Sequence, residues 1–349
     1  MTKQEKIHQV RKLNFTGEIS VKYIFTTISC LFLFSNLLLG AEVTNKKIYI
    51  AIESGAALGV IPAYLLRDIE QKTGAKIVDM ADGLAGISTG AIISSLIANG
   101  NYTADQARQF YYDYSGKIFS AALWGGLSNL VAQTGLWEEV NAAAEFENVI
   151  AQKFANAKLC ETKTYLMVLS SVDNEIVIFD SELAKNSSAH NTTQAMVVRA
   201  TASLPNIYSK AHVKFDDDKS WECVDAASLG INDPTPYLYK KLYEEKYDGE
   251  IIIYSLGTGA QDVSKSTRAL MDNNNNNSNS NIKIIRLQPD LSKVRGLEYY
   301  ISPILFNANA DHSRLKDLEA CAQELTNTEE YAQMLEDFKR VSGGLGEVR

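Results

Sequence analysis

The chain has 349 residues, of which 46% are apolar and 22% are charged, and its formal net charge is −8 at pH 7. This composition is ordinary for a globular protein of one large or two small domains, and it excludes extensive disorder. The acidic balance argues against a nucleic-acid-binding protein, which needs a basic surface.

The first predicted element is an N-terminal leader over residues 1–41. A mostly apolar run, IFTTISCLFLFSNLLL, occupies residues 24–39, with Lys22 before it and the small residues Gly40-Ala41 after it. This order is typical of a secretory signal peptide, and the run is short for a membrane-spanning helix. We therefore expect a protein that is exported and secreted after cleavage near Ala41. The alternative is a protein anchored in the membrane through residues 24–39, because Leu39 fits the cleavage site poorly.

Strands and helices alternate along the next part of the chain. A buried strand over 47–52 runs into a small-residue turn, and a helix follows with Pro62 in its first turn and Gly74 as its stop. A short apolar segment at 83–85 precedes a second apolar helix over 91–98. Apolar strands and helices in alternation predict an α/β sandwich with a largely parallel sheet.

Further elements extend this alternation to the C-terminus. Thr103 and Gln106 form a capping box at a helix start. Four more strands are predicted, over 164–171, 175–180, 251–256 and 282–287. The Asn-rich tract 272–281 (DNNNNNSNSN) is of low complexity and predicts a flexible surface loop within one domain. Two amphipathic helices close the chain.

The motif that indicates chemistry is G-x-S-x-G at Gly86-Ile87-Ser88-Thr89-Gly90, between a predicted strand and a predicted helix. A serine nucleophile at such a turn needs small neighbours, because the backbone there is sharply bent. The helix that follows aims its N-terminal N–H groups at the reacting oxygen. Ser88 is therefore the candidate nucleophile; the alternative is a tight helix start that Ser88 merely caps.

A serine hydroxyl needs a base to take its proton. In the α/β-hydrolase order Ser, Asp, His, the third member would be His312, the histidine nearest the C-terminus. His312 stands at a predicted helix start, where an exposed residue is the simpler interpretation. A carboxylate base is therefore the better option, and an α/β-hydrolase esterase with a Ser–Asp–His triad is an alternative.

The cysteines and histidines give no sign of a metal or disulfide framework. The four cysteines form no C-x-x-C pair, and the four histidines are scattered without an H-E-x-x-H motif. These spacings argue against a disulfide scaffold, a cysteine-based zinc site and a zincin. We expect neither a metal nor a cofactor.

Several sequence blocks, taken in order, resemble the patatin-like phospholipases over roughly residues 46–290. IYIAIESGAALG stands where that family has its oxyanion loop D-G-G-G-x-R-G, and GISTG stands at its nucleophile elbow. RATASLP resembles R-A-[ST]-x-x-x-P, VDAA and NDPT resemble D-G-[GA] and N-N-P-T, and YSLGTG resembles the S-L-G-T-G strand end. The common order and spacing of these blocks make the resemblance specific.

The resemblance implies a fold and a division of the chain. The implied fold is a three-layer α/β/α sandwich with a largely parallel central sheet. Residues 46–238 would form the catalytic core, and residues 239–349 would complete the fold with the Asn-rich loop and the two terminal helices.

The resemblance also implies a Ser–Asp dyad without histidine. Ser88 would be the nucleophile, Asp225 the proton acceptor, and Ser54, Gly55 and Ala56 the oxyanion hole. The implied reaction is hydrolysis of carboxylic esters of membrane lipids, as by a phospholipase A or lysophospholipase, through an acyl-Ser88 intermediate. The implied partners are a phospholipid or other acyl-ester lipid and a membrane surface, contacted peripherally.

The oxyanion loop departs from the family pattern. Glu53 replaces Asp, Ser54 and Ala56 replace glycines, and Leu58 replaces Arg. Glycine reaches positive φ at little cost, whereas Ala or Ser at such a position costs about 1 kcal/mol or more. A lipid-binding protein with this fold and a weak or dead site is therefore a further hypothesis.

Overall fold

The structure is a computed structural model that describes residues 45–118, 136–205, 207–260, 262–276, 281–294 and 312–347. The predicted leader over 1–41, and with it the alternative anchor over 24–39, lies outside the described residues. Among the described helices, none combines the length and the apolar character that crossing a bilayer requires.

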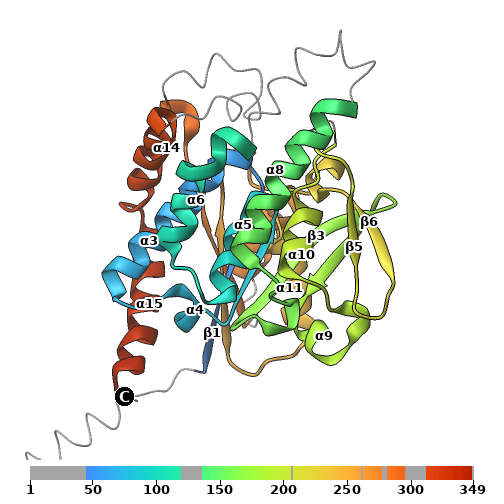
Figure 1. The fold of residues 1–349 in the computed structure, drawn as a ribbon. Coiled ribbons are helices and arrows are strands. Elements are labelled where there is room, and N and C mark those ends of the chain that lie inside the picture. Colours follow the sequence, from blue (N-terminus) through green and yellow to red (C-terminus); the bar gives the residue numbers. More distant parts are fainter. Residues whose placement is uncertain are drawn as a thin grey trace, which may run out of the picture. The chain divides into compact units, whose positions relative to one another are not determined.

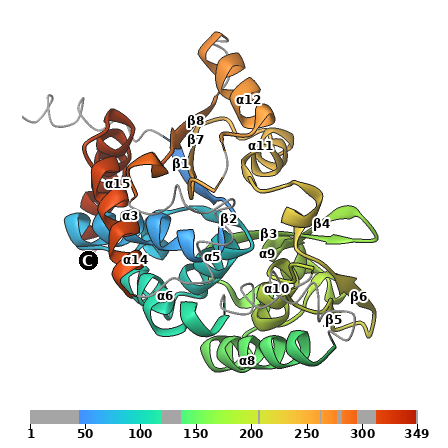
Figure 2. The same cartoon turned by 90° about the horizontal axis from the view of Figure 1, so that it is seen from above.

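A six-stranded sheet with the order β4-β3-β2-β1-β7-β8 forms the middle layer (Figures 1 and 2). Its strands are β1 (Lys46–Ile52), β2 (Gly83–Ile87), β3 (Tyr165–Val172), β4 (Glu175–Asp180), β7 (Glu250–Leu256) and β8 (Ile282–Leu287). Neighbouring strands are parallel except β3 and β4, which are joined by a turn at Asp173-Asn174 where both residues have positive φ. The prediction of a largely parallel sheet is confirmed.

Strand β1 shows how the sheet separates two apolar cores. Ile48, Ile50 and Ile52 face the larger core, and Tyr49 and Ala51 face the smaller one. Successive side chains of a strand point to opposite faces, so a strand covered on both sides is apolar throughout. This explains why KIYIAI has no polar alternation.

Helices cover both faces of the sheet, which confirms the three-layer α/β/α sandwich (Figure 2). The larger core is covered by α3 (Val60–Thr73), α4 (Ile77–Met80), α5 (Thr89–Asn99), α6 (Ala104–Ile118), α8 (Leu136–Phe154), α10 (Gln194–Thr201), α14 (His312–Leu325) and α15 (Glu329–Glu347). The smaller core is covered by α11 (Thr235–Glu244) and α12 (Lys265–Asn276). The two predicted terminal helices are thus present, and their apolar side chains face the larger core.

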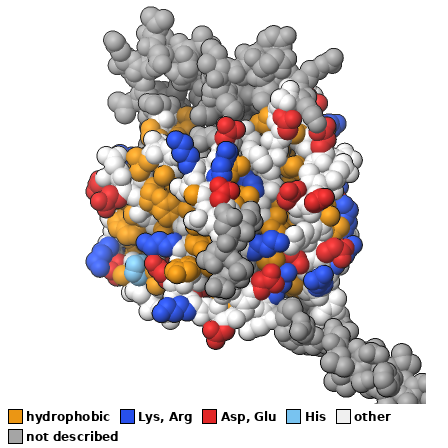
Figure 3. Space-filling model, turned by 180° about the vertical axis from the view of Figure 1, so that it is seen from behind, with side chains coloured by type: hydrophobic (Ala, Val, Ile, Leu, Met, Phe, Trp, Pro, Cys, Tyr) orange, Lys and Arg blue, Asp and Glu red, His pale blue; other side chains and the backbone are white. Residues whose placement is uncertain are grey.

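Smaller elements lie outside the main layers. They are α9 (Ser181–Asn186), the hairpin of β5 (Ala211–Lys214) with β6 (Ser220–Cys223), and the 3-10 helices η2 (Ala56–Gly59), η5 (Leu159–Glu161), η6 (Ser188–His190), η7 (Ala226–Leu229) and η8 (Leu291–Lys293). Few large apolar side chains of the described surface are exposed, namely Leu183, Leu229 and Tyr243. On the side opposite to Figure 1, apolar side chains are interspersed with charged ones (Figure 3).

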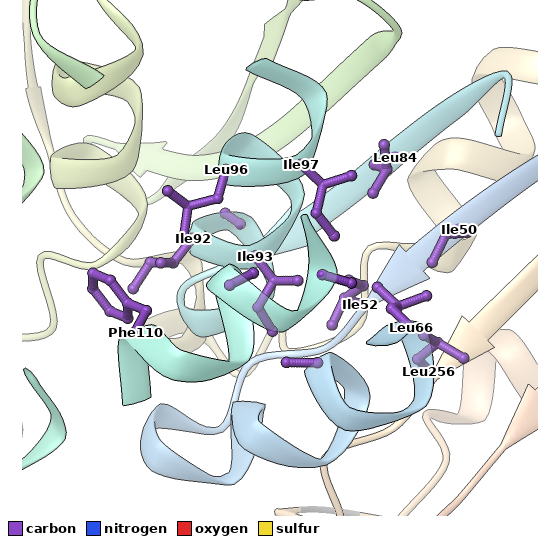
Figure 4. Packing of buried hydrophobic residues seen from close by; sticks show 14 of the residues in the cluster. Ile50, Ile52, Leu66, Leu84, Ile92, Ile93, Leu96, Ile97, Phe110 and Leu256 are labelled. Atoms are coloured by element: carbon purple, nitrogen blue, oxygen red, sulfur yellow. The ribbon is translucent and has the colours of Figure 1, made fainter. Parts of the chain in front are cut away.

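Helix α5 is buried along its whole length. Its isoleucine and leucine side chains pack among residues of β1, β2, α3 and α6 (Figure 4). A helix enclosed on every side has little freedom to shift, because protein interiors are close-packed. The residue that precedes this helix, Ser88, is therefore held at a fixed place relative to the sheet.

The Asn-rich tract is partly helical, so the prediction of a loop from residue 272 onward is wrong for residues 272–276. Helix α12 continues to Asn276. Leu270 and Met271 pack against the smaller core, and their packing fixes the helix that runs on into the tract. Residues 277–280 lie outside the described residues, and Asn281 immediately precedes β8.

Candidate active site

Three neighbouring strands bring the predicted site residues to one edge of the sheet. Ile52 at the end of β1 lies opposite Gly86 of β2, and Ile87 at the end of β2 lies opposite Leu169 of β3. Because these strands are parallel, the loop after β1 and the turn after β2 emerge side by side. In open α/β sheets, this carboxyl edge is where ligands bind.

Ser88 occupies a strained turn between β2 and α5. Its φ is 53° and its ψ is −119°, in a region that costs a non-glycine residue about 1–3 kcal/mol. The flanking glycines are required by close backbone contacts. A Cβ on Gly86 would overlap the backbone of Gly90 and Ala91, and a Cβ on Gly90 would overlap the carbonyl oxygen of Ile52.

The backbone of Ser88 is tied to α10 and β3 through Thr201. The Ser88 N–H donates to Thr201 Oγ1 at 2.8 Å, and that hydroxyl donates to the carbonyl oxygen of Leu169 at 2.6 Å. Thr201 is fully buried. Sequence reasoning assigned Thr201 no role, although it lies in the RATASLP block.

Asp225 reaches the same edge from a distant part of the chain. Val224 pairs with Ser171 at the end of β3, and the Asp225 N–H donates to the carbonyl oxygen of Ser203 at 3.0 Å. Asp225 then begins η7, where its Oδ1 accepts the Ala227 N–H at 2.9 Å. The Ser88 side chain lies close enough to the Asp225 carboxylate to lower the pKa of that carboxylate.

The Asp225 carboxylate is held away from water, with the residue only 1% exposed. Burial raises its pKa to about 7, and the Ala227 N–H and the Ser88 side chain oppose that rise. Desolvation disfavours the ionised form, whereas hydrogen bonds to a carboxylate favour it. The carboxylate is thus poised to exchange a proton near neutral pH.

Arg199, the charged residue of the RATASLP block, has a structural role. Its Nε donates to Glu147 at 2.9 Å, its Nη2 to the Ser209 carbonyl oxygen at 3.0 Å, and its Nη1 to Ser203 Oγ at 2.5 Å. Because the Ser203 carbonyl receives the Asp225 N–H, Arg199 supports the backbone that carries the carboxylate.

The loop after β1 is anchored at Ser54. Its N–H donates to the Asn232 carbonyl oxygen at 2.9 Å, its Oγ donates to Asn232 Oδ1 at 2.5 Å, and its own carbonyl oxygen accepts from Thr258 Oγ1 at 2.6 Å. The Ser54 N–H is therefore engaged within the protein. Of the three predicted oxyanion residues, Ser54 anchors the loop in this structure rather than presenting its N–H to a substrate.

Gly55 and Ala56 form the turn of this loop. Gly55 has φ 156°, and a Cβ there would overlap the Thr258 side chain. Ala56 has φ 49° and starts η2, where the Leu58 N–H donates to the Gly55 carbonyl oxygen at 3.0 Å. The alanine thus adopts the left-handed backbone that the family's glycine would favour, at a cost of about 1 kcal/mol. Leu58, where the family has Arg, is fully buried in the larger core.

The structure describes the side chains of two histidines, His190 and His212. His190 and His212 are exposed, and His212 Nδ1 pairs with Glu222 at 2.6 Å. Neither makes a recorded hydrogen bond to the serine or the aspartate within the described residues. The side chain of His312 lies outside them. Nor do any three His, Cys, Asp or Glu side chains of the described ranges gather as metal ligands would.

The chain is similar in sequence to patatins and to a phospholipase. Patatin-07 of Solanum tuberosum is 20% identical over 335 residues, covering 83% of this chain and 82% of the relative. Patatin-like protein 2 of Oryza sativa subsp. indica is 21% identical over 251 residues, 62% of each protein, so this chain spans less than two thirds of that relative. The cUMP-AMP-activated phospholipase of Escherichia coli is 32% identical over 101 residues, 29% of this chain and 31% of the relative.

Among solved structures, human GIVD cytosolic phospholipase A2 aligns at 10% identity with a TM-score of 0.42, covering 85% of this chain and 60% of that one. The family model for patatin-like phospholipases matches residues 50–239, which is more than half of the chain. The matched region runs from β1 into α11 and includes Ser54, Ser88 and Asp225. The chain therefore belongs to the patatin-like phospholipase family.

Proposed function

We propose that this protein is a lipid acyl hydrolase that cleaves carboxylic esters of membrane lipids through an acyl-Ser88 intermediate, with Asp225 as the base. Family membership supports lipid ester hydrolysis in general. The finer proposal depends on one observation: the Ser88 side chain lies next to the Asp225 carboxylate, which is almost completely buried and whose pKa Ser88 lowers.

The environment of Asp225 supports its role as a base. An exposed carboxylate is too weakly basic to take a serine proton efficiently at neutral pH, and catalytic bases work best with a pKa near the working pH. Burial raises the pKa of Asp225 to about 7. Because the Ser88 side chain is close enough to influence this pKa, the carboxylate is near the hydroxyl proton that has to move.

The first half of the reaction transfers the acyl group to the enzyme. Asp225 accepts the Ser88 hydroxyl proton while Oγ forms a bond to the ester carbonyl carbon. The C–O bond to the alcohol portion of the lipid then breaks, and Asp225 returns the proton to the departing oxygen. Acyl-Ser88 and a free alcohol result.

The second half releases the fatty acid. Asp225 accepts a proton from water as the water oxygen attacks the acyl carbon, and the bond to Ser88 Oγ breaks as that proton returns to the serine. Gly55 and Ala56, next to the first turn of η2, and the N-terminus of α5 supply backbone dipoles for the negative oxygen of each tetrahedral intermediate. Each N–H donor of this kind contributes about 100- to 1,000-fold in rate.

The departures in the oxyanion loop favour a second candidate, a lipid-binding protein with a weak or dead site. Ala56 holds a positive φ that a glycine would adopt without strain. A fluorophosphonate probe and hydrolysis of a diacyl phospholipid separate the two candidates. Labelling and turnover by the wild type, both absent in Ser88→Ala, would support the hydrolase; neither in a folded wild type would support the lipid-binding protein.

A further inference from the structure

A buried ion pair lies directly beneath the oxyanion loop. Glu53, the residue between β1 and the loop, has its Oε1 2.6 Å from Nη2 of Arg286, and both side chains are 4% exposed. Arg286 comes from β8, which is separated from β1 by β7. No motif in the sequence pointed to Arg286.

The end of β7 lets Arg286 reach across to Glu53. Arg286 Nη1 donates to Ser255 Oγ at 2.8 Å as the side chain passes β7. A Cβ on Gly257 would lie 2.6 Å from Arg286 Nη2, so a larger residue there would block the path. Gln288 Oε1 accepts from Arg286 Nε at 3.0 Å and holds the guanidinium from the far side.

A second carboxylate completes the cluster. Asp233 Oδ2 lies 4.0 Å from Arg286 Nη1 and accepts from Thr267 Oγ1 at 2.5 Å, while Oδ1 accepts the Thr235 N–H at 2.9 Å. One guanidinium therefore faces two buried carboxylates. Burial and the charge of Asp233 raise the pKa of Glu53, and Arg286 opposes that rise. Removing the guanidinium would leave uncompensated negative charge next to the loop.

Glu53 connects the buried ion pair to the loop after β1. Its N–H donates to the Leu256 carbonyl oxygen at 3.1 Å, and the Thr258 backbone lies close enough to its carboxylate to lower the pKa of Glu53. Thr258 in turn donates its hydroxyl to the carbonyl oxygen of Ser54. The charged cluster and the loop that carries Gly55 and Ala56 thus share the same anchoring residues.

We propose that Arg286 is a positioning residue of the oxyanion loop, which it holds in place through Glu53 and Thr258. The proposal rests on the proposed hydrolase function. The buried guanidinium supplies a cation from β8, whereas the family pattern has its Arg within the loop, where this chain has Leu58. Because oxyanion donors must be aligned closely with the reacting oxygen, loosening the loop lowers kcat more than it weakens substrate binding.

The test compares Arg286→Met and Arg286→Lys in the full chain with Asp337→Asn as a matched control. Asp337, itself buried, forms another ion pair with the partly exposed Lys46 Nζ at 2.9 Å, at the opposite end of β1. We expect Arg286→Met to lower kcat by about 10- to 100-fold with KM nearly unchanged, by analogy with a lost oxyanion donor. Arg286→Lys should retain more activity, and Asp337→Asn should keep the wild-type kcat.

Hydrogen exchange of the amides of residues 54–57 provides a readout independent of turnover. We expect faster exchange in Arg286→Met and not in Asp337→Asn. A folded Arg286→Met with wild-type kcat and wild-type exchange would overturn the proposal, as would an equal loss of kcat in Asp337→Asn.

The experiment also distinguishes a variant that does not fold from a failure of the proposed hydrolase function. If Arg286→Met does not fold, Glu53→Gln, which keeps the side-chain volume and removes the charge, takes its place with the same expectations and the same overturning result. If the wild type hydrolyses no ester, the proposed function fails, and exchange of the loop amides alone supports or overturns the positioning role.

Discussion

The backbone N–H of Ser88 donates to the hydroxyl of Thr201 at 2.8 Å, and the same hydroxyl donates to the carbonyl oxygen of Leu169. One buried side chain thereby fastens the strained turn of the candidate nucleophile to α10 and β3. The arrangement also engages the Ser88 N–H within the protein.

Replacing Thr201 by Val should lower kcat by about tenfold, because it leaves the Ser88 N–H unpaired and frees the turn to shift. Thr201→Ser keeps the hydroxyl and should restore most of the activity. Steady-state kinetics on a short-chain ester measure both. Thr192→Val is the control. Thr192 precedes the N-terminal end of α10, is also fully buried, and donates its hydroxyl to the Lys214 carbonyl oxygen at 2.6 Å. Equal losses of kcat in Thr201→Val and Thr192→Val would contradict a local effect.

Ser88→Ala and Asp225→Asn should each abolish nearly all turnover while the fold persists. Their losses should not add in the double variant, because residues that act as one catalytic unit are strongly non-additive. Hydrolysis of a diacyl phospholipid, with circular dichroism to verify folding, checks this. Substantial turnover by a folded Asp225→Asn would remove Asp225 from the mechanism.

The pH dependence of activity should report the buried carboxylate. The base must be ionised, so kcat/KM should rise with pH and level off above about 7, the pKa to which burial raises Asp225. An activity that is already maximal well below that pH would show that another group is the base.

The contribution of Asp225 to the free energy of unfolding should fall as pH rises, whereas activity should rise. The folded-state pKa of Asp225 lies above its ordinary value of 3.8, so the folded protein binds this proton more tightly than the unfolded chain. The stabilisation is complete below the ordinary value and is lost as pH rises through about 7. Asp225→Asn removes this contribution, so its stability relative to wild type should be greater at pH 8 than at pH 5. Urea unfolding at the two pH values measures the difference; an equal difference at both would contradict a raised pKa.

The histidines should contribute little to catalysis. His190 and His212 are exposed, and within the described part of the chain neither is hydrogen-bonded to Ser88 or Asp225, so His190→Ala and His212→Ala should keep the wild-type kcat. His312→Ala tests the triad directly. A large loss of kcat in folded His312→Ala would move the assignment to a Ser–Asp–His triad.

We propose that the protein is exported and that its leader is removed near Ala41, since Lys22, the apolar run and the small residues after it follow the order of a signal peptide. The intact mass of the exported protein should correspond to a chain that starts near residue 41 or 42. Recovery of only the full-length form in the membrane fraction would favour the anchor over residues 24–39 instead.

The sequence by itself determined the features that depend on near neighbours in the chain. Continuous apolar strands alternating with amphipathic helices indicated a parallel sheet between helices, and G-x-S-x-G marked the turn at Ser88, because only small residues allow so close a backbone approach. The loop predicted over 272–281 was wrong in its first half, because packing of Leu270 and Met271 outweighs the weak helix propensity of asparagine.

The tertiary structure alone decided how distant blocks meet. The pairing of Glu53 with Arg286 depends on the strand order β1-β7-β8, and the contact of Ser88 with Asp225 depends on the bridge between Val224 and Ser171. No local pattern fixes such contacts, since hydrophobic periodicity specifies which face of an element is buried but not which element lies beside it. The same holds for Ser54, whose N–H is engaged by Asn232 only because the fold brings two loops together.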